Sequence, residues 1–324
     1  MQKVLRLITQ NLWHGLDHTR PHIMLPLEKR EQNEARTHAL IEGLKDQLAG
    51  LRDSNSLGIV ALQEVNPVRK LSRILAKAIQ CRKKTAEANV GLRAGNFSYP
   101  FYLQEGLSLL WTPQSFFRVK SERVTLSQPV PEFKMLLGKW KIPLSFQLTE
   151  RRVALFLKGV FGDQKLGIVN LHLHHGVPEQ NSNARRLKEL TSLFERIEQD
   201  IRESDLFFLM GDFNCECHHD EFLFIKNQGF VELSVKADKS PMMTWDPDIN
   251  PLCKLTSSID PHDQKSLAWD KDPHQFDHIF VRYSLKPGTF PPGLQIKSFR
   301  LFDDKKFGAW VSDHYGIGVE LIWP

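Results

Sequence analysis

Carboxylate, amide and imidazole side chains recur in this chain where short apolar runs begin or end. The positions are Asn11, Gln63, Glu64, His172, His174, Asp212, Asn214, Asp277, His278, Asp313 and His314. Each alone has an ordinary explanation, because Asn and Asp at strand ends form turns and a His there usually packs into the core. Together they indicate one cleft, since the strand ends at one edge of a layered domain converge.

The residue types in this set suit a particular chemistry. Carboxylate and amide oxygens are the ligands that Mg²⁺ and Mn²⁺ prefer, and phosphate is the natural substrate for these ions. The oxygen donors are Glu64, Asp212, Asp313, Asn11 and Asn214. His172 and His314 are candidates for general base, general acid or stabiliser of phosphate charge, because imidazole titrates near neutral pH. The pattern predicts metal-assisted hydrolysis of a phosphate ester.

Alternating strand and helix patterns must position these residues. Strands are predicted at 4–13, 57–65, 107–113, 152–161, 165–174, 206–214, 276–282 and 315–323, and the clearest helices at 28–48 and 183–201. Strands and helices interleave along the whole chain, and no stretch rich in Pro, Gly or Ser marks a boundary. We therefore predict one mixed α/β domain over residues 1–324.

Composition limits the class of protein. The chain has 324 residues, of which 41% are hydrophobic and 25% charged, as in an ordinary globular domain. Its net charge of +5 is compatible with a polyanionic partner but is weak evidence for one. Four scattered cysteines do not resemble a disulfide framework. The first residues run directly into a strand pattern, and no run approaches the roughly 18 apolar residues of a membrane span, so we expect a cytoplasmic protein without a transmembrane segment.

The interval 129–148 does not fit the alternation of predicted strands and helices. It carries apolar residues beside Lys134, Lys139 and Lys141, with Pro129 near its start. One interpretation is an insertion whose apolar and basic face meets a membrane or a lipid-like substrate. The interpretation we favour is a loop and short helix that cover the core.

Six motifs taken in order carry a family resemblance. TQNLW, ALQEV, NLHL, GDFN, FDHIFV and SDHYG resemble the motif set of the endonuclease/exonuclease/phosphatase superfamily, which has the deoxyribonuclease I-like fold. The set extends from Asn11 to Gly316, almost the whole chain. The resemblance implies an α+β fold: a four-layer αββα sandwich in which two packed, mainly antiparallel sheets are flanked by helices.

The resemblance also implies roles for the residues. Glu64 is expected to be the main metal ligand, with Asn11 beside it and Asp313 contributing from the opposite half of the site. Asp212 is expected to orient or deprotonate the attacking water, and Asn214 to hold the phosphate.

Further roles concern the two histidines. His314 is expected to bind the scissile phosphate or act as a base, polarised by Asp277, with His172 across from it. The resemblance points to Glu105 as the carboxylate partner of His172. A family arginine matches Arg151 or Arg152.

Other clusters near the motifs have alternative interpretations. His174 shares a face with His172, and we favour core packing or a supporting hydrogen bond for it over a place in the substrate pocket. Cys215, Cys217, His218 and His219 in CECHH are soft ligands that suit zinc, with Cys253 as a distant partner, but we favour solvated loop residues. A scaffold that has lost catalysis is a remote alternative, because none of the matched positions is substituted.

The substrate class stays open between two candidates, with a phosphodiester favoured over a monoester. MTWDPDINPL followed by FDHIFVR resembles tyrosyl-DNA phosphodiesterases, and Trp245 either stacks on a base or substrate ring or packs the rim of the site. Nucleic acid is therefore slightly favoured. The alternative is a lipid headgroup, as in sphingomyelinase-like or phosphoinositide-cleaving members, and the 129–148 interval is the feature that supports it.

Overall fold

The computed structural model describes most of the chain. The described residues are 2–13, 30–88, 91–94, 97–100, 105–127, 132–137, 142–147, 152–175, 181–236, 239–253, 272–283 and 293–324. For 91–94, 97–100, 132–137 and 142–147 the description covers the backbone alone. None of the helices in these ranges is long and apolar enough to span a membrane.

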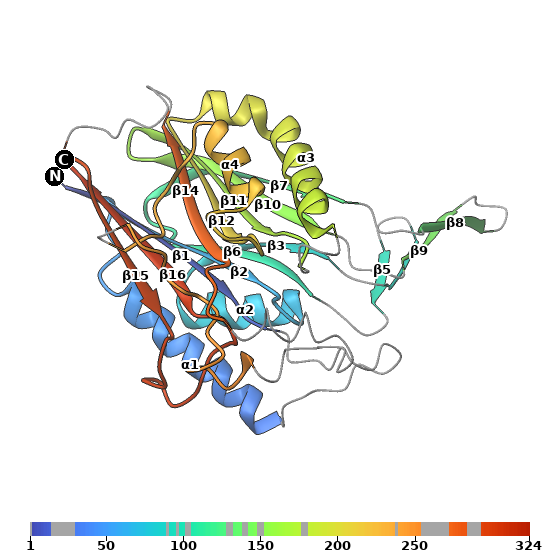
Figure 1. Cartoon of the computed structure of the whole chain (residues 1–324), viewed down its shortest axis with the longest axis horizontal. Coiled ribbons are helices and arrows are strands. Elements are labelled where there is room, and N and C mark those ends of the chain that lie inside the picture. Colours follow the sequence, from blue (N-terminus) through green and yellow to red (C-terminus); the bar gives the residue numbers. More distant parts are fainter. Residues whose placement is uncertain are drawn as a thin grey trace.

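Two six-stranded sheets form the centre of the structure (Figure 1). The first has the order β15 (Gln295–Leu301), β16 (Gly316–Trp323), β1 (Lys3–Asn11), β2 (Ser56–Gln63), β6 (Gly106–Trp111) and β3 (Arg82–Glu87). The second has the order β13 (Val231–Glu232), β14 (Asp277–Tyr283), β12 (Leu206–Asp212), β11 (Gln164–His172), β10 (Val153–Phe161) and β7 (Phe116–Thr125). Within them only β1 with β2 and β11 with β12 pair in parallel.

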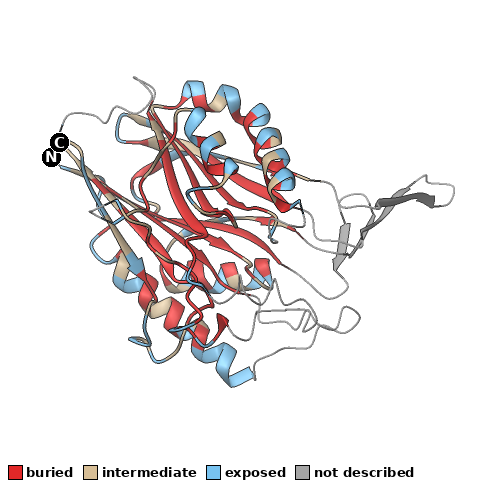
Figure 2. Cartoon of the chain, viewed as in Figure 1, coloured by how far each residue is buried: buried red, intermediate tan, exposed pale blue. Residues whose placement is uncertain are grey.

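Helices cover the outer face of each sheet. In Figure 1, α1 (Arg30–Leu48) and α2 (Val68–Ala78) lie on one side of the molecule, and α3 (Ser182–Glu203) and α4 (Asp220–Asn227) on the other. One apolar core lies between the sheets, and a further core lies under each helical layer. Figure 2 shows the central strands buried and the helices exposed on their outward faces, while the edge strands β15 and β7 are partly exposed. The four-layer, mainly antiparallel α+β sandwich expected from the sequence is confirmed.

Strand β12 shows why the sequence LFFLM is apolar without interruption. Leu206, Phe208 and Met210 point into the core between the sheets. Phe207 and Leu209 point into the core under α3. Both faces are therefore buried, as expected of a central strand covered on both sides. Each such side chain contributes about 1.5–3 kcal/mol by leaving water.

Gly211 ends this apolar run directly before Asp212, a candidate site residue. Its φ is +143°, and a Cβ at this position would overlap the carbonyl oxygen of Leu171 on the neighbouring strand. Only glycine allows β11 and β12 to approach so closely here. The next residue, Asp212, is thereby placed opposite His172 in the parallel register.

A buried amide pair joins the two sheets beneath the strand ends. Gln63 Nε2 donates to Asn170 Oδ1 at 2.7 Å, and Asn170 Nδ2 donates to the carbonyl oxygens of Leu62 and Ser108 at 3.0 and 2.9 Å. Both amide side chains have no exposed surface. These bonds fix how one sheet is placed over the other, because a buried amide is costly unless its partners are in position.

The interval 129–148 contains strands where we expected a loop and short helix. Strand β8 (Glu132–Leu137) pairs with β9 (Ile142–Gln147), and β9 pairs with β4 (Gly91–Ala94), which pairs with β5 (Phe97–Pro100). Figure 1 draws β8 and β9 apart from the two large sheets. Pro129, Pro131 and Pro143 disfavour strands in the sequence, yet β9 contains Pro143 opposite Leu136 of β8. That this interval is an insertion stays a prediction.

We predict that Asn170→Leu lowers the free energy of unfolding by about 3 kcal/mol. The Leu62 and Ser108 carbonyls lose the Asn170 donor, and Gln63 Nε2 keeps only its bond to Thr9 Oγ1. Urea denaturation followed by circular dichroism measures the change. Asn227→Leu, at the exposed end of α4, is the matched control and should change stability by no more than about 0.5 kcal/mol. Equal stability of Asn170→Leu and wild type would contradict a structural role for the amide pair.

Candidate active site

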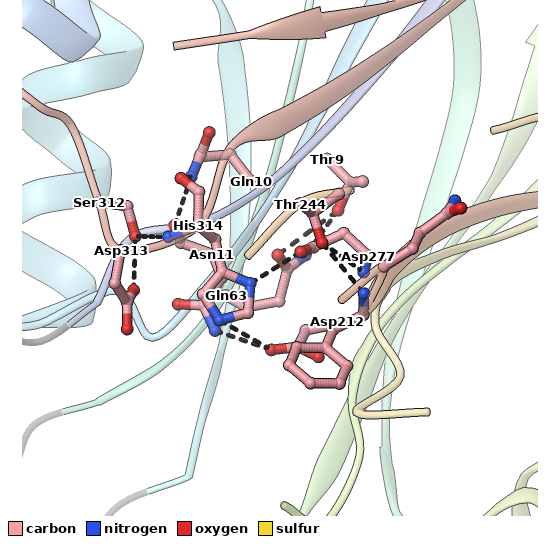
Figure 3. Close-up of polar contacts among 12 residues, drawn as sticks. Thr9, Gln10, Asn11, Gln63, Asp212, Thr244, Asp277, Ser312, Asp313 and His314 are labelled. Atoms are coloured by element: carbon pink, nitrogen blue, oxygen red, sulfur yellow. Dashed lines mark hydrogen bonds and ion pairs between the residues drawn. The ribbon is translucent and has the colours of Figure 1, made fainter. Parts of the chain in front are cut away.

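Several predicted site residues lie close together where strands of the two sheets end, and Figure 3 shows Asn11, Asp212, Asp277, Asp313 and His314 among them. Asn11 and His172 end β1 and β11, Asp212 ends β12, and Asp277 begins the antiparallel strand β14. Parallel strands present their carboxyl ends at the same edge, and this is where functional side chains of α/β structures usually lie. The convergence that the sequence predicted is therefore observed for these four positions.

The side-chain amide of Asn11 connects the two sheets at this edge. Its Nδ2 donates to Glu64 Oε1 at 3.1 Å and to Asp212 Oδ2 at 2.9 Å. Its Oδ1 accepts a hydrogen bond from the backbone N of Trp13 at 2.9 Å. In this orientation the amide positions the two carboxylates. Metal ligation by the Asn11 oxygen stays a prediction.

Asp212, Asp277 and His314 form a buried cluster whose polar atoms lie within 4.8 Å of one another. Asp212 and Asp277 are directly opposed in the antiparallel register of β12 and β14. His314 Nδ1 lies 2.8 Å from Asp277 Oδ2, and His314 Nε2 lies 4.0 Å from Asp212 Oδ2. Asp277 thus orients the imidazole so that Nε2 faces Asp212, which agrees with the predicted pairing of these residues.

The burial of this cluster changes its protonation. Burial, together with the nearby charge of Asp277, raises the pKa of Asp212 to about 7. Burial disfavours the charged form of His314, but the carboxylates of Asp277 and Asp313 outweigh it and raise its pKa well above the usual value. Near neutral pH Asp212 is therefore able to take up or release a proton, while His314 stays protonated.

His172 lies across from His314 and is held in a different state. Burial, followed by the charge of Arg152, lowers its pKa well below the usual value, so its imidazole is neutral. Its Nε2 lies 3.7 Å from Asp212 Oδ2 and 3.9 Å from Glu64 Oε1. Its Nδ1 lies 3.2 Å from an Arg152 guanidinium nitrogen.

Three other predicted residues surround these histidines. Arg152 also approaches His175 Nδ1 at 3.4 Å, whereas Arg151 lies outside the described residues. Glu105 is buried, and its backbone carbonyl accepts from Ala88 N at 3.0 Å. Its pairing with His172 stays a prediction.

Glu64 and Asn214 leave their strands through left-handed backbone conformations, with φ of +51° and +50°. Such conformations cost energy for residues other than glycine, and they persist where the surroundings fix the side chain. Asn214 N donates to Asp212 Oδ1 at 2.9 Å, and Asn214 Nδ2 donates to the Leu173 carbonyl at 3.1 Å. These bonds keep Asn214 beside Asp212. Its role in holding the phosphate stays a prediction.

Asp313 faces a separate set of contacts. Its Oδ1 accepts from Ser312 Oγ at 3.0 Å, and its backbone carbonyl accepts from Asn250 Nδ2 at 3.2 Å. It influences His314 through its charge, but it is not one of the three residues whose polar atoms cluster around Asp212. Its role as a metal ligand from the opposite half of the site stays a prediction.

Trp245 and His174 lie at the margins of the site. Trp245 is 6% exposed and packs with Cys253 and Phe276, which matches the packing alternative considered for it. His174 Nε2 lies 3.2 Å from an Arg185 guanidinium nitrogen, and its backbone N donates to Glu189 Oε2 at 2.9 Å. Burial and the neighbouring arginines lower the pKa of His174 to about 4. Substrate contact by either residue stays a prediction.

Several supporting residues were not singled out from the sequence. They are Gln10, whose amide donates to the His314 carbonyl, Thr244, which accepts from Phe276 N and Asp277 N, and Ser312, which accepts from His314 N. Asn170 belongs to the same group. A polar residue within an otherwise apolar strand is the signal that identifies Gln10 and Asn170, because such a residue must find a buried partner.

The donor set fits a hard divalent cation. The carboxylates of Glu64 and Asp212 both accept a hydrogen bond from the Asn11 side-chain amide. Asp277 Oδ1 is buried without a hydrogen-bond partner among the described residues. Crowded, buried carboxylates are destabilised by mutual repulsion, and a cation relieves it. An ion that enters from solvent can reach Glu64, because 18% of its side-chain surface is accessible, against 2% for Asp212.

Comparison with known proteins identifies the class. Residues 8–314 match the model of the Endonuclease/Exonuclease/phosphatase family, so the chain belongs to this family. Its members are in general phosphoester hydrolases that use a divalent metal. Among curated protein sequences none matches.

Solved structures share the fold at low sequence identity. Truncated TDP2 from Caenorhabditis elegans is 16% identical with a TM-score of 0.60, covering 99% of this chain and 98% of that one. D. rerio TDP2 complexed with a single-strand DNA product is 17% identical with a TM-score of 0.57, covering 98% of each chain. An endonuclease/exonuclease/phosphatase from Bacteroides vulgatus is 15% identical with a TM-score of 0.62, covering 98% of each chain. At these identities the likeness establishes the fold alone.

We predict that Asp277→Asn lowers the pKa of His314, because the largest charge that stabilises the imidazolium is removed. NMR titration of the imidazole signals in the presence of a chelator measures the change. Asp304→Asn, in an exposed loop, is the control and should leave the His314 titration as in wild type. An unchanged titration in Asp277→Asn would show that the Asp277 contact does not set the state of His314.

Proposed function

We propose that the protein is a Mg²⁺-dependent phosphodiesterase and that its substrate is a nucleic acid, with Mn²⁺ as an alternative ion. The observation that carries the proposal is the buried cluster of Asp212, Asp277 and His314 beside the Asn11 to Glu64 contact. It combines a proton acceptor, an oriented cation and a hard oxygen ligand within one strand-end site. These are the components that hydrolysis of a phosphate ester needs.

Asp212 and His314 perform the proton and charge chemistry in this proposal. Asp212, with a pKa of about 7, accepts the proton of the attacking water. Its orientation is fixed by Asn11 Nδ2 and by Asn214 N, so the acceptor oxygen is directed into the site. His314, kept protonated by Asp277, presents Nε2 to the negative charge that develops on the phosphate oxygens.

The remaining residues bind the phosphate and the ion. Glu64 would hold the divalent cation, with Asp313 as a predicted contributor, and the ion supplies positive charge that polarises the phosphoryl group. Neutral His172 and the cationic Arg152 beside it offer hydrogen bonds to phosphate oxygens from the other sheet. Asn214 offers a side-chain amide close to Asp212.

The preference for nucleic acid rests on two observations. The D. rerio TDP2 structure that shares this fold contains a single-strand DNA product. The segment from Met243 to Leu252 in this chain resembles the corresponding region of tyrosyl-DNA phosphodiesterases, and Thr244 within it supports Asp277. The net charge of +5 agrees with a polyanionic substrate.

We predict that Glu64→Ala and His314→Ala each reduce kcat at least about 10³-fold, because one removes the main ion ligand and the other the charge opposite the phosphate. Turnover of a bis-aryl phosphodiester measures the effect, with Mg²⁺ present and again after chelation, which should abolish wild-type activity. Glu31→Ala, on the exposed first turn of α1, is the control. Activity within tenfold of wild type in either site variant would overturn the assignment.

We predict that nucleic acid is turned over in preference to lipid. The panel contains single- and double-stranded DNA, RNA, a 5′-tyrosyl oligonucleotide, and sphingomyelin and phosphoinositide vesicles, each with Asp212→Ala as the inactive control. Apparent affinity for DNA should fall steeply as salt rises, because phosphate contacts release counterions. Turnover of vesicles without turnover of DNA would overturn the nucleic-acid assignment. Silence across the panel would favour a specialised substrate outside it or a non-catalytic scaffold.

A further inference from the structure

A second group of ligand atoms lies in the turn that follows Asn214. Glu216, His218 and His219 each place one side-chain ligand atom within 4.8 Å of the others. The turn is closed by a hydrogen bond from His219 N to the Glu216 carbonyl at 3.0 Å, and His219 caps the start of α4. His218 Nε2 lies 3.9 Å from Glu216 Oε2. The local backbone thus brings three donors to one point.

His274 adds a fourth donor from a distant part of the sequence. Its Nδ1 lies 3.2 Å from Glu216 Oε1. The backbone of His274 is fixed by two hydrogen bonds with Trp245, of 2.8 and 3.0 Å, and its ring stacks on Phe276 with centroids 4.9 Å apart. A donor held in this way loses little conformational entropy when it binds a ligand.

A hydrogen bond inside the turn holds His219 beside Glu216. The Nδ1 of His219 accepts a hydrogen bond from Glu216 N at 3.2 Å, and binding of an ion through this nitrogen would replace that bond.

We propose that Glu216, His218, His219 and His274 form a binding site for a transition-metal ion of the Zn²⁺ class, separate from the Mg²⁺ site. Three imidazoles with one carboxylate are donors of intermediate softness, which favour Zn²⁺ over Mg²⁺. Tetrahedral zinc with bonds of about 2.0–2.1 Å places its ligand atoms about 3.3 Å apart. Glu216 lies 3.2 Å from His274 Nδ1 through Oε1 and 3.9 Å from His218 Nε2 through Oε2. His274 is outside the group of three whose ligand atoms lie within 4.8 Å of one another, so side chains must turn for it to join them around one ion.

This site differs from the thiolate site considered from the sequence. Cys215 and Cys253 are buried, each within an apolar cluster, and burial raises the pKa of both thiols. Neither sulfur belongs to the group of ligand atoms formed by Glu216, His218 and His219. Cys217 is exposed and lies between Glu216 and His218, but it is not a member of the ligand cluster. The proposed ligands are therefore imidazole nitrogens and a carboxylate oxygen, in place of the cysteine sulfurs considered from the sequence.

The position of the site suggests what an ion there would do. His274 forms a β-bridge with Trp245, which forms another with His314. An ion bound to Glu216 and His274 would join the turn before α4 to this bridge, and so hold the segment after Asn214 against the segment that carries His314. We therefore expect the ion to stabilise the folded protein by mass action.

The test measures Zn²⁺ binding to tag-free, chelator-treated protein by competition with a metal-binding dye. We expect wild type to bind one equivalent more than His218→Ala/His219→Ala. Cys217→Ser is the matched control for thiol binding and Glu64→Ala the control for the Mg²⁺ site, and both should retain that equivalent. Equal Zn²⁺ stoichiometry in wild type and His218→Ala/His219→Ala would overturn the proposal, as would loss of the equivalent in Cys217→Ser.

Thermal unfolding provides an independent readout. Saturating Zn²⁺ should raise the Tm of wild type by about 3 °C or more beyond any rise in His218→Ala/His219→Ala. His218 is largely exposed, with 67% of its side chain accessible, so His218→Ala alone keeps the fold and serves if the double variant does not. A Zn²⁺-induced rise in Tm of equal size in His218→Ala would count against the site.

Discussion

The Asn11 amide is the contact on which the functional edge of this protein depends. It reaches from the first sheet to Asp212 in the second while also bonding Glu64. Buried carboxylates need donors, and an amide can supply two N–H groups without adding charge. The pair of Gln63 and Asn170 repeats the same device deeper between the sheets. Two sheets that could slide on apolar contacts alone are thereby held in one register, and the strand ends stay in reach of one another.

The electrostatics of the site follow from this packing. Asp212 and Asp277 are forced together by strand pairing and buried, which raises the pKa of Asp212 to about 7. His314 offsets part of this repulsion and is kept cationic in return. The arrangement costs folding free energy, because charged groups are removed from water. It also creates a proton acceptor and a fixed cation a few ångströms apart, which is the combination that phosphate ester hydrolysis uses.

Family membership and substrate are separate matters for this fold. The sheets and their strand-end motifs match the endonuclease/exonuclease/phosphatase family along residues 8–314. Structures with the same architecture are 15–17% identical to this chain, a level at which the loops around the site differ freely. The turn with Glu216, His218 and His219 is such a rim element, placed directly after a family motif. Substrate and metal preferences that depend on these loops must therefore be inferred from this chain's own residues.

The sequence by itself determined the strand runs, the two long helices, and the set of residues at the strand ends, because periodicity and short motifs are local properties. Family resemblance supplied the layer order. Tertiary structure alone decided the orientation of the Asn11 amide, the approach of Arg152 to His172, the burial of Trp245, and the pairing of the strand at 142–147 with the strand at 91–94. Each of these depends on a partner outside the local stretch of sequence. Such partners are chosen by how the sheets pack, which local patterns do not encode.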